Sequence, residues 1–167
     1  MKFWQRFAIS IFVLISFTVA LPSIAQAASS AAIRAYDDVV VNSKDFSNQD
    51  LRSAEFAEVK LKEADFSNAE MQGAVFNNVD LTNANWENAD FSDGIAYLAQ
   101  FINTNLRNAI FTETMLLRST FKNVDITGAD FSFAVLDGVQ RKNLCAVATG
   151  TNPVTGMDTR ESLECNS

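Results

Sequence analysis

The chain has 167 residues, enough for one domain, and 48% of them are hydrophobic. It contains no histidine, so it lacks the commonest general base and a frequent transition-metal ligand. The formal net charge of −7 disfavours nucleic acid and anionic lipid as partners, because both are negatively charged.

Residues 1–27 are predicted to be a secretory signal peptide. Lys2 and Arg6 form its basic start, Phe7 to Leu21 is a nearly unbroken apolar run, and Ala25-Gln26-Ala27 fits a cleavage site. The run is shorter than the roughly 20 residues of a membrane span, so we expect no stable membrane anchor after cleavage. An uncleaved N-terminal anchor is the alternative. Loss of the two basic residues takes the formal net charge from −7 to −9.

Residues 28–43 are assigned as an N-terminal cap segment. Ser29 or Ser30 fits the N-cap of a short helix through Tyr36. The extended run Val39-Val40-Val41 would then lead into the next segment.

Residues 44–138 repeat with a period of five. Nine of the ten Phe residues after the signal peptide lie at the repeat centres, with Phe133 as the exception, and Ala96 is the only centre that is not bulky and apolar. Mostly small residues such as Ala64 stand two positions before each centre. Because a period of five fits neither a helix nor a strand, neither is the main element, and the apolar centres are the candidate core of a repeat architecture. The aromatic centres are Phe46, Phe56, Phe66, Phe76, Trp86, Phe91, Phe101, Phe111, Phe121 and Phe131.

The segments Ala64-Asp65-Phe66-Ser67-Asn68 and Ala129-Asp130-Phe131-Ser132-Phe133 resemble the motif of the pentapeptide-repeat family. The resemblance implies an all-β solenoid, a right-handed quadrilateral β-helix with four repeats in each coil. Asparagines recur at the matching twenty-residue spacing, and we expect them to form hydrogen-bonded ladders between coils. They are Asn48, Asn68, Asn88 and Asn108 in one series and Asn83, Asn103 and Asn123 in another. In such a coil Trp86 would face Ala96, a large residue opposite a small one.

Residues 139–167 are predicted to form a small α-helical C-terminal cap, because the repeat ends where Arg141 replaces an apolar centre. Asp137 and Gln140 fit a capping box that opens a helix through about Ala148. Gly150, Pro153 and Gly156 mark a turn region. Asp158 and Glu161 repeat the capping pattern before a second short helix that ends near Cys165.

Cys145 and Cys165 are the only two cysteines, and in an exported chain they most simply form a disulfide. Two free thiols are the alternative. The pattern from Leu144-Cys145 to Leu163-Glu164-Cys165 resembles the tail of thylakoid-lumenal pentapeptide-repeat proteins of cyanobacteria and chloroplasts. That resemblance implies a disulfide-closed cap and a cyanobacterial protein exported to the thylakoid lumen or periplasm.

We expect no catalytic residue, cofactor or metal site. The carboxylates before the centres would line convex surfaces with no cleft to perturb their pKa values. We interpret these columns as solvated acidic faces, with calcium binding as the alternative. They are Asp45, Asp65 and Asp125 on one face and Asp50, Glu70, Asp90 and Asp130 on the next.

One face carries apolar residues where the others carry polar ones, and it is the candidate binding site for a protein partner. The alternative is that the segment from Ala28 to Val41 or a cap helix covers it. The candidate residues are Val75, Ile95, Tyr97, Leu98, Met115, Leu117 and Val135.

The sequence therefore favours a monomeric, exported, non-catalytic interaction or scaffold module whose protein partner is unknown. One alternative is an acidic DNA mimic that binds a topoisomerase, although export separates it from that cytoplasmic target. The other is a redox-sensitive lumenal switch, in which reduction of the disulfide between Cys145 and Cys165 loosens the cap.

Overall fold

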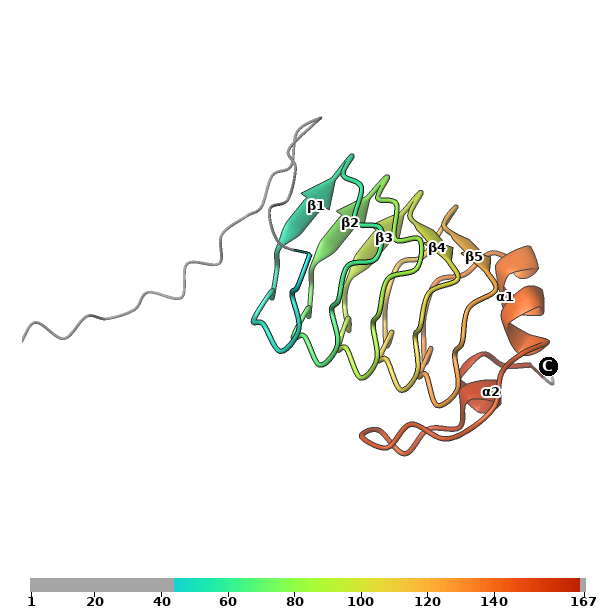
Figure 1. The fold of residues 1–167 in the computed structure, drawn as a ribbon. Helices are drawn as coiled ribbons and strands as arrows, with labels where there is room; N and C mark the ends of the chain where they lie inside the picture. Colours follow the sequence, from blue (N-terminus) through green and yellow to red (C-terminus); the bar gives the residue numbers. More distant parts are fainter. Residues whose placement is uncertain (1–43, 166–167) are drawn as a thin grey trace, which may run out of the picture.

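The computed structural model describes residues 44–165, so the predicted signal peptide and N-terminal cap segment lie outside the described residues. The described chain winds into a stack of coils, with two helices against its C-terminal end (Figure 1). β1 (Glu55–Ala57), β2 (Val75–Asn77) and β3 (Ile95–Tyr97) form one parallel sheet, and β4 (Gln100–Ile102) and β5 (Thr120–Lys122) form another.

Each coil contains twenty residues, or four five-residue repeats. Phe56 pairs with Phe76 and Phe76 with Ala96, while Phe101 pairs with Phe121. Isolated parallel bridges join the remaining repeats at the same spacing. The register confirms the predicted coil length and the β-helix fold.

We number the four faces of the coil by their centres. Face 1 has Phe46, Phe66, Trp86, Leu106 and Ile126, and face 2 has Leu51, Met71, Phe91, Phe111 and Phe131. Face 3 has Phe56, Phe76, Ala96, Leu116 and Leu136, and face 4 has Leu61, Leu81, Phe101 and Phe121.

The corners explain the abundance of asparagine. The residue two positions after nearly every centre has a positive φ, for example 55° at Asn68 and 57° at Asn88. Asparagine adopts this left-handed backbone more readily than most residues. Its amide also forms the predicted ladder from Asn68 onward, but not between Asn48 and Asn68: Asn88 donates to Asn68 at 3.2 Å and Asn108 to Asn88 at 3.1 Å. A second ladder joins Asn83, Asn103 and Asn123.

A buried hydroxyl closes one corner that lacks the usual backbone bond. At most corners the third residue after the centre donates to the carbonyl of that centre, as Ala69 does to Phe66 at 3.1 Å. After Ala96, the Ser119 hydroxyl from the next coil lies in this gap. It accepts from the Ala99 N–H at 3.0 Å and donates to the Ala96 carbonyl at 2.6 Å.

Removing that hydroxyl should therefore be costly. We expect Ser119→Ala to lower the free energy of unfolding by about 1–3 kcal/mol, because it leaves a buried N–H and a carbonyl unpaired. Urea denaturation measures the effect. The control is Ser67→Ala, whose side chain is partly exposed at an ordinary corner and which should cost less than about 0.5 kcal/mol. Equal losses in the two variants would contradict this role for Ser119.

The centres form a continuous aromatic core. Nine of the ten predicted aromatic centres are buried, and Phe121, in the last coil, is half-buried. Trp86 is fully buried, and the face-3 centre of the same coil is the small residue Ala96. Its ring centroid lies 5.1–6.1 Å from those of Phe66, Phe76, Phe91, Phe101 and Phe111.

The cap covers the last coil, and two buried amides attach it there. α1 (Gly138–Cys145) begins at the predicted capping box of Asp137 and Gln140. The Gln140 amide donates to the carbonyls of Leu116 and Ser119 at 2.8 and 2.6 Å. The Asn152 amide donates to those of Asn108 and Gly128 at 3.1 and 2.9 Å.

Both cap helices end earlier than the sequence indicates. α1 stops at Cys145, because the chain then turns back so that the Thr149 carbonyl accepts from Gly128 at 2.8 Å. α2 (Thr159–Ser162), capped by Asp158, ends before Glu164, whose φ of 54° is left-handed. No helix within residues 44–165 is long and apolar enough to cross a membrane.

Candidate interaction surface

An apolar stripe runs down face 3 across successive coils. Val75 pairs with Ile95 in the sheet, and parallel bridges continue from Ile95 to Met115 and from Met115 to Val135. These residues precede the buried centres and therefore point to the opposite side of the backbone. Val75 is half-buried, whereas Ile95, Met115 and Val135 are 37%, 42% and 46% exposed. We call these four residues the apolar stripe.

The other three predicted binding residues lie on face 3 or at its edge. Tyr97 and Leu117 are half-buried on the face, and Leu98 is 41% exposed at the corner, where its φ is 56°. The Arg118 guanidinium donates to the Tyr97 hydroxyl at 3.0 Å and lies 5.9 Å from the centre of its ring. The structure thus brings all seven predicted residues together on one side of the solenoid.

Phe133 adds to this surface and was not among the predicted binding residues. It is 83% exposed and has a φ of 59°, an unusual backbone for a bulky residue. It lies at the corner two residues before Val135, beside the apolar stripe. The sequence did contain a signal for it: Phe133 is the only Phe after the signal peptide that lies outside the repeat centres.

A groove separates the corner at Arg118 from the cap. It has a volume of about 240 Å³ and lies between the last coil and α1. Its lining includes Arg118, Phe121, Asp137 and Val139. Val139, on the cap side of this groove, is 70% exposed.

The acidic residues before the centres hold the corners of the coil. The carboxylates of Asp65 and Asp130 each accept the backbone N–H two residues further on, at 2.9 Å in both cases. Asp130 is 2% exposed. Such turns favour Asp and Asn at this repeat position. The interpretation of these columns as purely solvated faces was therefore incomplete, and for Asp130 it was wrong.

Hydrogen bonds and neighbouring basic groups lower the pKa of several of these carboxyls. The Arg52 side chain, 2.6 Å from Asp50, lowers the pKa of Asp50 to about 2. Burial, the largest single influence, raises the pKa of Asp80, but hydrogen bonds from Thr82 and the charge of Lys62 outweigh it and leave that pKa lowered. The pKa of Asp125 is lowered in the same way, with Thr127 and Arg107 outweighing burial.

These shifts predict the direction of an acid-dependent loss of stability. A carboxyl whose pKa is lower in the folded state stabilises the fold fully above its unfolded pKa of about 4. That contribution is lost as the pH falls through the folded pKa, so we expect the urea midpoint to decrease between about pH 4 and pH 2. Asp50→Asn should make the decrease shallower. An identical pH profile for this variant and the wild type would contradict the assignment.

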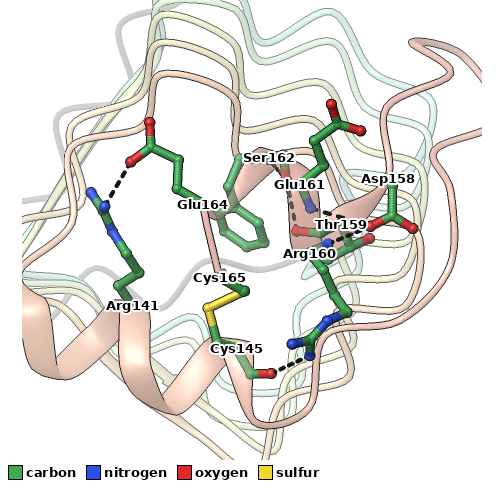
Figure 2. Close-up of a disulfide and its surroundings, with 10 residues drawn as sticks. Arg141, Cys145, Asp158, Thr159, Arg160, Glu161, Ser162, Glu164 and Cys165 are labelled. Atoms are coloured by element: carbon green, nitrogen blue, oxygen red, sulfur yellow. Dashed lines mark hydrogen bonds and ion pairs between the residues drawn. A yellow bond between two sulfur atoms is a disulfide. The ribbon is translucent and has the colours of Figure 1, made fainter. Parts of the chain in front are cut away.

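The described residues contain no group of three or more Cys, Asp or Glu placed to hold a metal ion. Cys145 and Cys165 form a disulfide, with a Cα–Cα distance of 5.5 Å, that ties the end of α1 to the chain after α2 (Figure 2). Arg160 donates to the Cys145 carbonyl at 2.9 Å, and Arg141 pairs with Glu164 at 2.8 Å (Figure 2). The cysteines thus close the cap at the end of the solenoid.

A stack of five-residue repeats, closed by a cap and presenting an apolar stripe, defines a repeat solenoid of the kind that offers an extended binding surface. The pentapeptide repeats family matches residues 42–68, 69–95 and 97–132 in eight copies. The chain therefore belongs to the pentapeptide-repeat family.

Relatives of the chain include lumenal proteins. It is 60% identical to the chloroplastic thylakoid lumenal protein TL20.3 of Arabidopsis thaliana over 38 residues, which are 23% of this chain and 14% of that protein. It is 33% identical to a solved pentapeptide repeat protein from the Arabidopsis thaliana thylakoid lumen, covering 73% of this chain and 92% of that one with a TM-score of 0.39. HetL of the cyanobacterium Nostoc sp. strain PCC 7120 is 19% identical, with 56% and 41% coverage and a TM-score of 0.38.

Proposed function

We propose that the protein is an exported, non-catalytic interaction or scaffold module that binds a protein partner through face 3. The observation that carries the proposal is the apolar stripe. Three of its four residues are more than a third exposed, in consecutive coils and in hydrogen-bonded register. Contiguous apolar surface of this kind usually marks an interaction site.

The support beneath the stripe suits a rigid docking surface. The buried centres Phe76, Ala96 and Leu116 lie directly behind it, and backbone hydrogen bonds join each coil to the next, as from Ile95 to Ala74 at 2.9 Å. A preorganised surface loses little conformational entropy on binding, which favours affinity. In this proposal the coil is right-handed and four-sided, as the family resemblance implies.

The chemistry of the chain supports a non-catalytic role. The sequence has no histidine, and many of its aspartates accept hydrogen bonds in corner turns. Hydrogen bonds and basic neighbours lower the pKa values of Asp50 and Asp80. A lowered pKa keeps a carboxyl ionised, whereas a general acid or base near neutral pH needs a raised one. These carboxylates stabilise corners and are poorly suited to proton transfer.

The proposed compartment is extracytoplasmic, with the thylakoid lumen favoured over the periplasm. The predicted signal peptide supports export, and disulfides persist in oxidising compartments. Two relatives are thylakoid-lumen proteins by name.

DNA mimicry fits the surface less well than protein binding does. A protein that mimics a DNA duplex needs acidic groups along its whole length. Here face 3 is apolar, and face 4 exposes the basic residues Lys60, Lys62 and Lys122. A redox switch at the disulfide is compatible with the proposed scaffold, because reduction would release the cap without changing the apolar stripe.

Replacing Val75, Ile95 and Met115 together by serine tests the proposal. We expect the triple variant to keep the wild-type melting temperature, because these side chains lie outside the core, and to lose a specific crosslinked partner seen with the wild type. The matched control replaces Lys60, Gln100 and Thr120 by serine, which are exposed at the same repeat position on face 4, and should keep the partner. Loss of monomer stability in the stripe variant would instead mean that the chain covers its own stripe.

A further inference from the structure

A column of two carboxylates and an aromatic ring borders the apolar stripe. Asp93, Glu113 and Phe133 occupy the same corner of successive coils, since the Asp93 N–H donates to Thr112 at 3.0 Å and the Glu113 N–H to Ser132 at 2.9 Å. Each lies two residues before a member of the stripe, and all three are exposed. We call these three residues the acidic corner.

The two carboxylates lack the basic partners that several other acidic residues of the coil have. Arg52 pairs with Asp50 and Glu70, Lys62 with Asp80, and Arg107 with Asp125. Within the part of the chain that the structure describes, neither Asp93 nor Glu113 makes an ion pair. Like charges stacked on neighbouring strands repel each other, so a cation from outside would relieve the repulsion.

Phe133 gives the same corner a second feature that suits a cation. The face of an aromatic ring attracts Arg and Lys within about 6 Å of its centre. The ring is exposed on the coil that follows Glu113, so one basic side chain of a partner can contact both. The net charge of −7 also favours the approach of a basic partner.

We propose that the partner contacts face 3 with a basic amphipathic segment. Its apolar side chains would pack on Ile95, Met115 and Val135, and its Arg or Lys side chains would lie against Asp93, Glu113 and Phe133. This inference rests on the proposed function, because it assigns a partner chemistry to the same surface.

Selection from a random dodecapeptide library, displayed on phage and panned on the purified disulfide-bonded protein, tests the inference. Peptides that also bind the Ile95→Ser/Met115→Ser variant are discarded. We expect the remaining peptides to be enriched in Arg and Lys beside apolar residues. A synthetic copy of the most enriched peptide should bind about three- to tenfold more weakly to Asp93→Asn/Glu113→Gln, as expected for two surface ion pairs, and more weakly at high salt.

The matched control is Glu58→Gln/Glu63→Gln, which removes the same charge from two exposed corners away from the acidic corner and should leave binding unchanged. Melting of Asp93→Asn/Glu113→Gln at or above the wild-type temperature shows that weaker binding is not unfolding. Peptides that need the stripe but carry no positive charge, and bind both charge variants equally, would overturn the inference and leave the proposed function standing. Recovery of no stripe-dependent peptide would count against the proposed function itself.

Discussion

The Trp86→Ala substitution is expected to lower the free energy of unfolding by about 3–5 kcal/mol. Trp86 is fully buried and contacts five other rings, so its loss leaves a large cavity in the middle of the stack. Urea denaturation followed by far-UV circular dichroism measures the change. Trp86→Phe should cost less, because its ring refills part of the cavity and removes an indole N–H that has no hydrogen-bond partner.

Substitution of Ala96 tests whether the space that Trp86 fills is shared with position 96. Ala96→Phe should destabilise the wild type by about 1–3 kcal/mol, because the space beside Ala96 is already filled. In the Trp86→Ala background the same substitution should cost less, because the new ring enters the cavity left by the indole. Strictly additive effects would contradict the expectation that Trp86 compensates for the small residue at position 96.

The second large effect concerns the disulfide. Cys145→Ser/Cys165→Ser should lower the free energy of unfolding of the cap by about 3 kcal/mol, because the bond restrains a loop between cysteines twenty residues apart. Hydrogen exchange at the Phe131 amide measures this loss, since that N–H donates to the Ser162 hydroxyl of α2 at 3.0 Å.

Its control is the core of the solenoid, far from the cap. Exchange at the Phe76 amide, between β2 and its neighbours, should change much less than exchange at Phe131. Adding a dithiol reductant to the wild type should reproduce the effect of the double variant. Unchanged protection of the Phe131 amide would mean that the buried leucines of the cap and the amides of Gln140 and Asn152 hold it without the disulfide.

Much of the solenoid can be predicted from the sequence, because the residues that determine it lie close together in the chain and recur from repeat to repeat. The side chain at each centre must be apolar and the corner residue must tolerate a positive φ, so Phe66 and Asn68 have counterparts in most repeats. The same logic predicted the capping box of Asp137 and Gln140, since both of its hydrogen bonds lie within four residues.

Other contacts depend on which coils meet, and the period carries no information about them. The Ser119 hydroxyl closes a corner more than twenty residues earlier, and the Asn152 amide reaches a carbonyl 44 residues earlier. The end of α1 at Cys145 depends on Gly128 in the last coil. The five-residue pattern places Ser119 in the column of small residues two positions before a centre, but it does not show which carbonyl the hydroxyl reaches. It carries no information about Asn152, which lies outside the repeats.

The apolar stripe was predictable and the acidic corner was not, for a related reason. An apolar residue before a centre departs from the repeat pattern, so Ile95 and Met115 are conspicuous. Asp93 and Glu113 match the polar composition of ordinary corners. What sets them apart is their place beside the stripe together with the lack of a basic partner such as Asp50 and Asp80 have, and both depend on the three-dimensional register.

Site-specific photocrosslinking in intact cells, followed by mass spectrometry, tests the interaction role most directly. A photoreactive residue is placed at Met115 on face 3 or, as the control, at the exposed Gln100 on face 4. We predict a chain that starts at Ala28, is two hydrogens lighter than its dithiol form, and crosslinks to one discrete protein from Met115 but not from Gln100. A full-length chain with two free thiols, or the same crosslinks from both positions, would contradict an exported protein that binds through face 3.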